Sequence, residues 1–293
     1  MHGPRLTSLG DTAGSLAGSR GRAALLAAAA AEATSARLQE RGAPTAAEIT
    51  AALRRHDGSA PPGPHTASAM TLARRLSGSA GTVDVDALTA GLQTVGPVAR
   101  TAVHVAEGTI ANGSVGPAAW IWPVGLLTAL PLEEVAALAG EIAVRCTTVA
   151  LSQDTAVAHA VATALAARRM DIEPDVFVDA VAAHTVTPPL REAMRVTKML
   201  LRARAEPEFV AAQFPTRRRS PRRCLASALT AFLLHPRDPV ATVRTSLAQA
   251  GAVSEVAVMA AALVGAHTGE RALPAAWRSP AARGLLARWP TPA

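Results

Sequence analysis

The chain has 293 residues, of which 49% are hydrophobic and 17% are charged, a balance that excludes a disordered protein because it supplies enough apolar surface for a core. Its net charge of +7 is spread thinly along the sequence, so we do not expect nucleic acid as a partner. The two cysteines, Cys146 and Cys224, form no metal motif and indicate a reducing compartment.

The composition favours helices over strands. Alanine, a strong helix former, dominates the apolar fraction, whereas Tyr is absent and the chain has four Phe and four Trp residues. No segment alternates with a period of two residues, and no repeat of 20–50 residues is present. We therefore predict an all-α fold, a compact single-domain multi-helix bundle that spans residues 1–293.

The chain starts with a Gly/Ser-rich segment, residues 1–21, in which Gly10, Gly14 and Gly18 recur at a spacing of four. In a helix this spacing places glycines on one face, where another backbone can come close. The alanine-rich run at 23–31 is too short to span a bilayer, and Glu32 interrupts it, so we interpret it as a buried first helix rather than a signal peptide. No other segment reaches membrane length, and we predict a cytoplasmic protein without membrane contact.

Further helices follow in chain order. Thr45 and Glu48 form a capping box that opens a helix through Arg55, and Pro174 stands where a proline at the first helical position would. Residues 112–123 lack a helical period. The remaining predicted helices cover residues 68–76, 84–94, 97–108, 132–146, 155–169, 189–204, 224–234, 239–251 and 254–267.

Two segments are predicted to lie outside the packed helices. Residues 215–223 contain the run from Arg217 to Arg223, and arginine side chains can bind phosphates as bidentate donors. Aromatic residues that would stack on bases are absent nearby, so we predict a solvated basic loop. Residues 279–293 are predicted to form a loose C-terminal tail.

The last third of the sequence contains an ordered set of motifs. It reads Ala250-Gly251-Ala252-Val253-Ser254-Glu255, then an alanine-rich stretch, Gly269, Leu273-Pro274 and Trp277. This set resembles the C-terminal segment of the ADP-ribosylglycohydrolase family, which includes the dinitrogenase reductase-activating glycohydrolases. Earlier segments resemble the same family in the same order, namely residues 10–18, 62–70, Gly96-Pro97 and 116–126.

The resemblance implies a helical fold that holds two magnesium ions and cleaves the glycosidic bond of ADP-ribose. The family carries its metals between a T-D-D and a D-x-D-T segment. Here the first segment reads His65-Thr66-Ala67, and in the second Ala252 and Ser254 replace the aspartates while Glu255 replaces the threonine. Magnesium requires several anionic oxygens. We therefore expect no metal cofactor at these positions.

These losses predict a ligand-binding or regulatory pseudoenzyme, with a pocket for an ADP-ribose-like or other small molecule. Trp120 would supply a stacking wall beside Trp122, unless both side chains fill the core. Thr66, Ser68 and Ser254 would position the ligand.

Two alternatives remain open from the sequence. Glu255 and His65 would form a catalytic acid–base pair in a metal-independent enzyme, although Ser254 and Glu255 also fit the start of an ordinary helix. In the second alternative an active glycohydrolase uses displaced ligands, such as Asp11 and Asp57.

Overall fold

The computed structural model describes residues 18–39, 44–79, 83–90, 115–214, 220–250 and 253–290, together with Leu16 and Leu92. Within these ranges every regular element is a helix and no strand occurs, which confirms the predicted all-α fold. The predicted helix at 97–108 and Arg217 to Arg219 lie outside the described residues. No helix in the described ranges has the length and apolar character needed to cross a membrane.

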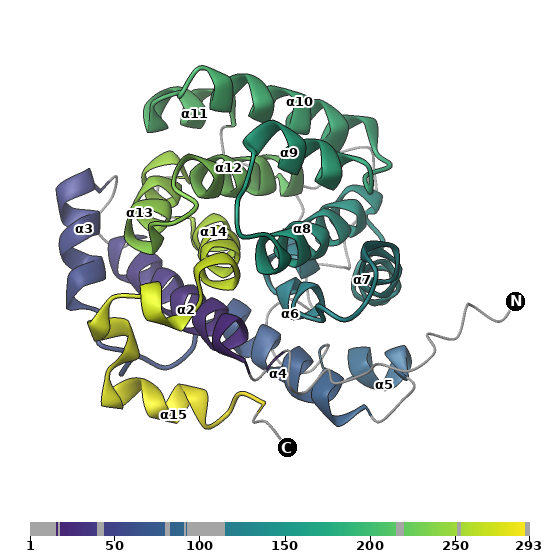
Figure 1. Ribbon diagram of the computed structural model, residues 1–293, viewed down its shortest axis with the longest axis horizontal. Coiled ribbons are helices and arrows are strands. Elements are labelled where there is room, and N and C mark those ends of the chain that lie inside the picture. Colours follow the sequence, from purple (N-terminus) through teal and green to yellow (C-terminus); the bar gives the residue numbers. More distant parts are fainter. Residues whose placement is uncertain are drawn as a thin grey trace, which may run out of the picture.

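Three helices form the centre of the molecule: α2 (Ser19–Gln39), α8 (Ala150–Arg168) and α14 (Ser254–Thr268) (Figure 1). Each is buried around most of its circumference, as expected for helices that carry alanine on all sides. Gly265 of α14 lies so close to α2 that an added Cβ would fall 2.6 Å from the backbone oxygen of Ala23. Small side chains therefore allow the two backbones to come into direct contact.

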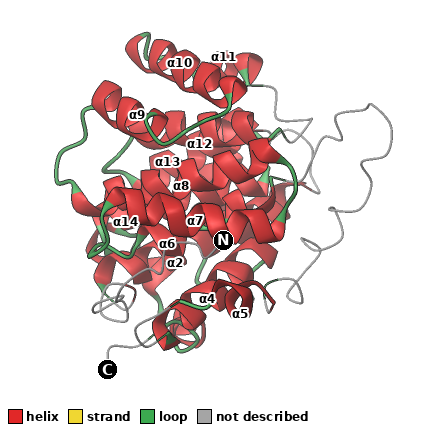
Figure 2. Cartoon of the chain, turned by 90° about the vertical axis from the view of Figure 1, so that its right-hand side faces the viewer, coloured by secondary structure: helices red, strands yellow, loops and turns green. Residues whose placement is uncertain are grey.

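Other helices cover this centre on opposite sides. Helices α9 (Pro174–Ala182), α10 (Pro188–Arg202) and α11 (Pro207–Gln213) lie on one side, and α4 (Pro64–Gly78) and α5 (Val85–Ala90) lie on the other (Figure 2). The remaining α-helices of the main body are α3 (Ala46–Arg55), α6 (Trp122–Gly125), α7 (Leu132–Cys146), α12 (Pro221–Leu234) and α13 (Pro239–Ala250), and the 3-10 helix η2 (Gly116–Ala119) precedes α6.

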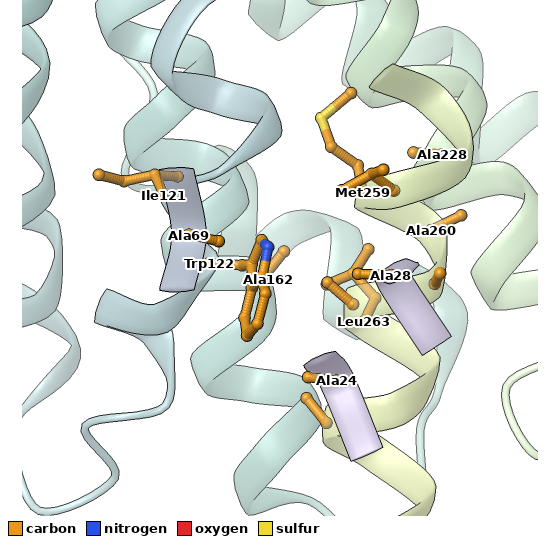
Figure 3. Close-up of a cluster of buried hydrophobic side chains, with 14 of the residues drawn as sticks. Ala24, Ala28, Ala69, Ile121, Trp122, Ala162, Ala228, Met259, Ala260 and Leu263 are labelled. Carbon is orange, nitrogen blue, oxygen red and sulfur yellow. The ribbon is translucent and has the colours of Figure 1, made fainter. Parts of the chain in front are cut away.

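Helices α2 and α14 run antiparallel. Gly265 faces Ala23 and Ala24. Glu270, just after the end of α14, forms an ion pair with Arg22 near the start of α2. Figure 3 shows the same pairing further along, where Ala28 lies beside Ala260 and Leu263. Each helix advances about 1.5 Å per residue, so the start of α14 lies level with the last third of α2.

Several predicted boundaries are confirmed by the structure. The capping box of α3 is present, with Thr45 Oγ1 accepting from Glu48 N at 3.3 Å and Glu48 Oε2 accepting from Thr45 N at 2.8 Å. Helix α7 has the predicted bounds, and Pro174 occupies the first turn of α9. Gly269 ends α14 with a φ of 75°, a conformation that glycine adopts without strain.

Several predicted segments differ from the structure, among them the helix predicted at 155–169, which is α8 and starts at Ala150. Helix α4 starts at Pro64 rather than at residue 68, because proline is well suited to the first helical turn and Glu32 caps the start from another helix. Arg222 and Arg223 belong to the first turn of α12 rather than to the basic loop. Helix α11, which sequence reasoning did not predict, follows α10 directly.

The predicted loose tail is largely ordered. Residues 280–286 form the 3-10 helix η6 (Pro280–Ala282) and α15 (Arg283–Leu286), after η4 (Glu270–Ala272) and η5 (Ala275–Arg278). The indole of Trp289 stacks on Trp122 with ring centroids 5.5 Å apart, and its N–H donates to the Leu16 carbonyl at 2.7 Å. The expectation of a loose tail is therefore wrong up to residue 290, because a buried aromatic side chain holds the segment against the core.

Candidate functional site

The buried carboxylate of Glu32 joins α2 to the start of α4. Its Oε1 accepts from the His65 backbone N at 2.9 Å, and its Oε2 accepts from the Thr66 backbone N at 3.0 Å. The first N–H groups of a helix have no partner within the helix and carry partial positive charge, so they bind a carboxylate well. The side chain is 3% exposed. Glu32 therefore caps α4 at the segment where the sequence predicted a ligand site.

Gly63 makes room for this cap. It precedes α4 with a φ of −68°, which any residue can adopt, so the glycine is not required for its backbone conformation. A Cβ at this position would lie 2.3 Å from the carboxyl carbon of Glu32. The absence of a side chain at Gly63 thus allows the carboxylate to reach the helix end.

The three predicted site residues of α4 differ in their surroundings. Ser68 donates to the Pro64 carbonyl at 2.8 Å, a bond within its own helix, so its hydroxyl is already engaged. Thr66 is fully buried, and its Oγ1 has no hydrogen-bond partner in the described part of the chain. The buried Nδ1 of His65 also has none there. Thr66 and His65 therefore retain hydrogen-bonding capacity that the fold does not use.

The start of α14 carries the other two predicted residues. Ser254 is the first residue of the helix, and Val253 precedes it as the N-cap without a side-chain cap. The expectation that Ser254 acts as the cap is therefore wrong by one position. Its hydroxyl instead donates to Oε2 of Glu255 at 3.3 Å. Glu255 is 4% exposed and stands in the first turn, where a carboxylate interacts favourably with the helix dipole.

The antiparallel register places Glu255 and Glu32 at the same height. Glu255 lies ten residues before Gly265, and Gly265 faces Ala23 and Ala24, so the first turn of α14 is level with residues just after Glu32. The structure thus brings the starts of α4 and α14 to one end of α2. It gives no hydrogen bond between the His65 and Glu255 side chains among the described contacts.

The core also buries three ring side chains, those of Trp120, Trp122 and His159. Trp120 is 1% exposed and Trp122 is fully buried, so in this structure both rings fill the core rather than form an open stacking wall. His159 Nδ1 donates to the Ala118 carbonyl, and its Nε2 has no partner in the described residues. Burial lowers the pKa of His159 to about 4, so the ring is neutral at pH 7.

Comparisons with known proteins show the family and the fold of the chain. The family model described as ADP-ribosylglycohydrolase matches residues 13–289. The chain belongs to the ADP-ribosylglycohydrolase family. It is also similar to a solved structure titled "ADP-ribosylglycohydrolase-related protein complex", with a TM-score of 0.67 over 92% of this chain and 95% of the other. The sequence identity of 19% limits that likeness to the fold. No curated protein sequence matches the chain.

Among the described residues of the two segments that resemble the family's metal motifs, His65 to Ala67 and Val253 to Glu255, Glu255 is the one carboxylate. Within the described ranges, no group of three or more His, Cys, Asp and Glu side chains is placed to hold a metal ion. Both oxygens of Glu32 already accept from backbone N–H groups. Asp57, proposed as a displaced ligand, accepts from Ser59 in an exposed turn, and Asp11 lies outside the described residues. The described donor set therefore does not fit a two-magnesium centre.

Sequence reasoning missed Glu32 as a member of this site. It used the residue only as a break in an apolar run. One signal was present, because Glu32 is the sole acidic residue of α2 and stands among fully buried alanines. A carboxylate in such surroundings needs hydrogen-bond donors, and donors must then come from elsewhere in the chain.

Proposed function

We propose that this chain binds an ADP-ribose-type ligand through hydrogen bonds and acts as a regulatory pseudoenzyme without metal-dependent glycohydrolase activity. The observation that carries the proposal is the engagement of Glu32, whose carboxylate caps α4 through two backbone N–H groups. A carboxylate that is committed to the fold in this way is a poor metal ligand, since binding a cation would uncap the helix.

Unused polar atoms support a ligand at this end of α2. Thr34 Oγ1, His65 Nδ1 and Thr66 Oγ1 are buried and have no hydrogen-bond partner within the described residues. A buried polar group without a partner costs about 1–3 kcal/mol, so such atoms are usually paired. The hydroxyl and phosphate groups of ADP-ribose offer both donors and acceptors to these atoms.

A titration of the purified protein with ADP-ribose tests the proposal. We expect ADP-ribose to raise the melting temperature equally in EDTA and in magnesium, and neither magnesium nor manganese alone to raise it. Bound ligand would also change the tryptophan fluorescence. Stabilisation that requires the metal, or metal-dependent release of ADP-ribose from a modified protein, would contradict the proposal.

A metal-independent enzyme is the second candidate. It is favoured by the contact between the Ser254 hydroxyl and the Glu255 carboxylate, at the same height as Glu32. Glu255 and His65 would then act as the acid–base pair. The variant Glu255→Gln separates the two candidates, because it abolishes product formation in an enzyme and leaves a binding protein with its affinity nearly unchanged. Glu133→Gln is a matched control, since Glu133 is a first-turn acid of α7.

A further inference from the structure

A pocket lies away from the starts of α4 and α14. It measures about 890 Å³ and shares no lining residue with the site described above. Its walls come from the ends of α10 and α12, the starts of α3, α9 and α11, and the middle of α13. This volume falls in the range of small-molecule sites, which runs from about 300 to 1,000 Å³.

Arg204, one of the lining residues, adopts a backbone conformation that favours glycine. Its φ is 47°, and no other non-glycine residue in the described ranges has a positive φ. It follows α10, where Arg204 N donates to the Leu201 carbonyl and Ala205 N donates to the Leu200 carbonyl, each at 3.0 Å. This hydrogen-bond pattern ends many helices and usually has glycine at the position of Arg204. An arginine here is strained, which indicates that its side chain has a use.

Two guanidinium groups reach the pocket. Arg204 and Arg244 line the pocket, and neither makes an ion pair or a side-chain hydrogen bond with another described residue. Arg244 also lines an adjoining pocket of about 460 Å³, and Arg54 lines that pocket as well. Guanidinium groups bind phosphate oxygens through paired N–H donors.

The remaining lining residues suggest what accompanies the phosphate. The carboxylates of Glu206 and Glu208 also line the pocket, and they accept hydrogen bonds from hydroxyl groups. Thr245 adds a hydroxyl, while Leu201 and Leu233 form an apolar wall. A bare phosphate ion would be repelled by the glutamates, whereas a phosphorylated polyol places its phosphate and its hydroxyls on different groups.

We propose that this pocket binds a sugar phosphate, with the phosphate held by Arg204 and Arg244 and the sugar hydroxyls facing Glu206 and Glu208. The inference goes beyond the proposed function, because it concerns other residues, and it stands or falls independently of ADP-ribose binding at the first site.

Isothermal titration calorimetry with ribose 5-phosphate tests this proposal. Ribose and inorganic phosphate, the two parts of that molecule, are titrated separately as partial ligands. We expect ribose 5-phosphate to bind more tightly than either partial ligand. The variants Arg204→Gly and Arg244→Gln should each weaken its binding at least tenfold, because each removes a charged donor pair. Arg74→Gln, a charge loss on an exposed residue of α4, should leave the affinity unchanged.

The melting temperature of Arg204→Gly provides an independent readout. Glycine relieves the positive φ, so the variant should melt no lower than the wild type while it loses affinity. Failure of ribose 5-phosphate to bind, wild-type affinity in the Arg204→Gly or the Arg244→Gln variant, or a lowered melting temperature of Arg204→Gly would each overturn the proposal. The same variants are also titrated with ADP-ribose. Their affinity for ADP-ribose reports on the first site, so the two proposals can fail separately.

Discussion

The starts of α4 and α14 both carry predicted site residues, yet the acidic side chain at each start comes from a different place in the chain. At α4 the capping carboxylate comes from another helix, since Glu32 lies more than 30 residues before its partners His65 and Thr66. At α14 the nearest acid is local, because Glu255 belongs to the first turn and contacts its neighbour Ser254. The start of α4 is therefore tied to α2, whereas Glu255 contacts a residue of its own helix. Substitutions at α4 should affect stability more than substitutions at α14.

The largest expected effect is that of Glu32→Ala. It removes two charge-assisted hydrogen bonds and leaves two buried N–H groups unpaired, so the free energy of unfolding should fall by about 3 to 5 kcal/mol. Urea denaturation followed by circular dichroism measures this change. A loss below about 1 kcal/mol would show that Glu32 does not hold α4 in place.

Acid should weaken the core between α8 and α14 through His159. Its pKa of about 4 in the folded state lies below the ordinary value of 6.5, so the unfolded chain binds the proton more tightly. The stability that His159 contributes is complete above pH 6.5 and is lost as the pH falls towards 4, by up to about 3 kcal/mol.

Denaturation curves at several pH values check this expectation. The variant His159→Asn should show a shallower loss of stability with falling pH. Burial also lowers the pKa of His56 and His267, and both residues contribute in the same direction in either protein, so the difference isolates His159. Equal slopes for the variant and the wild type would contradict the prediction.

Gly63→Ala should destabilise the protein by about 1 to 3 kcal/mol, because its methyl group would displace the Glu32 carboxylate. Gly78→Ala is the matched control. Gly78 is the last residue of the same helix and has open space around its Cα, so alanine there should be neutral or stabilising. In the Glu32→Ala background the cost of Gly63→Ala should shrink, which a double-mutant cycle measures.

The smallest effect is expected for Glu255→Ala. The carboxylate interacts with the dipole of its own helix, which contributes about 0.3 to 1 kcal/mol. The free energy of unfolding, measured by urea denaturation, should therefore fall by about 1 kcal/mol or less. A loss as large as that of Glu32→Ala would erase the difference between the two helix starts.

Local features of this fold are predictable from sequence, and the site is less so. The capping box of α3 and the bounds of α7 follow from residues a few positions apart, which interact in any helix start. The segments around His65 and Glu255 were found through their resemblance to a family. Glu32 and Trp289 were not, because their partners lie far away in the sequence and no local pattern encodes such a contact.

The hydrogen bond from Trp289 to Leu16 has a consequence for how the protein is made. The two residues lie 273 positions apart, so the contact forms only after the residues between them have left the ribosome. Helix α2 is synthesised more than 200 residues before α14, whose surface buries its alanines. The α2 surface that α14 covers therefore stays exposed until α14 emerges, and is open to aggregation or to capture by chaperones. Truncation before Ser254, which removes α14, should leave the chain in that exposed state.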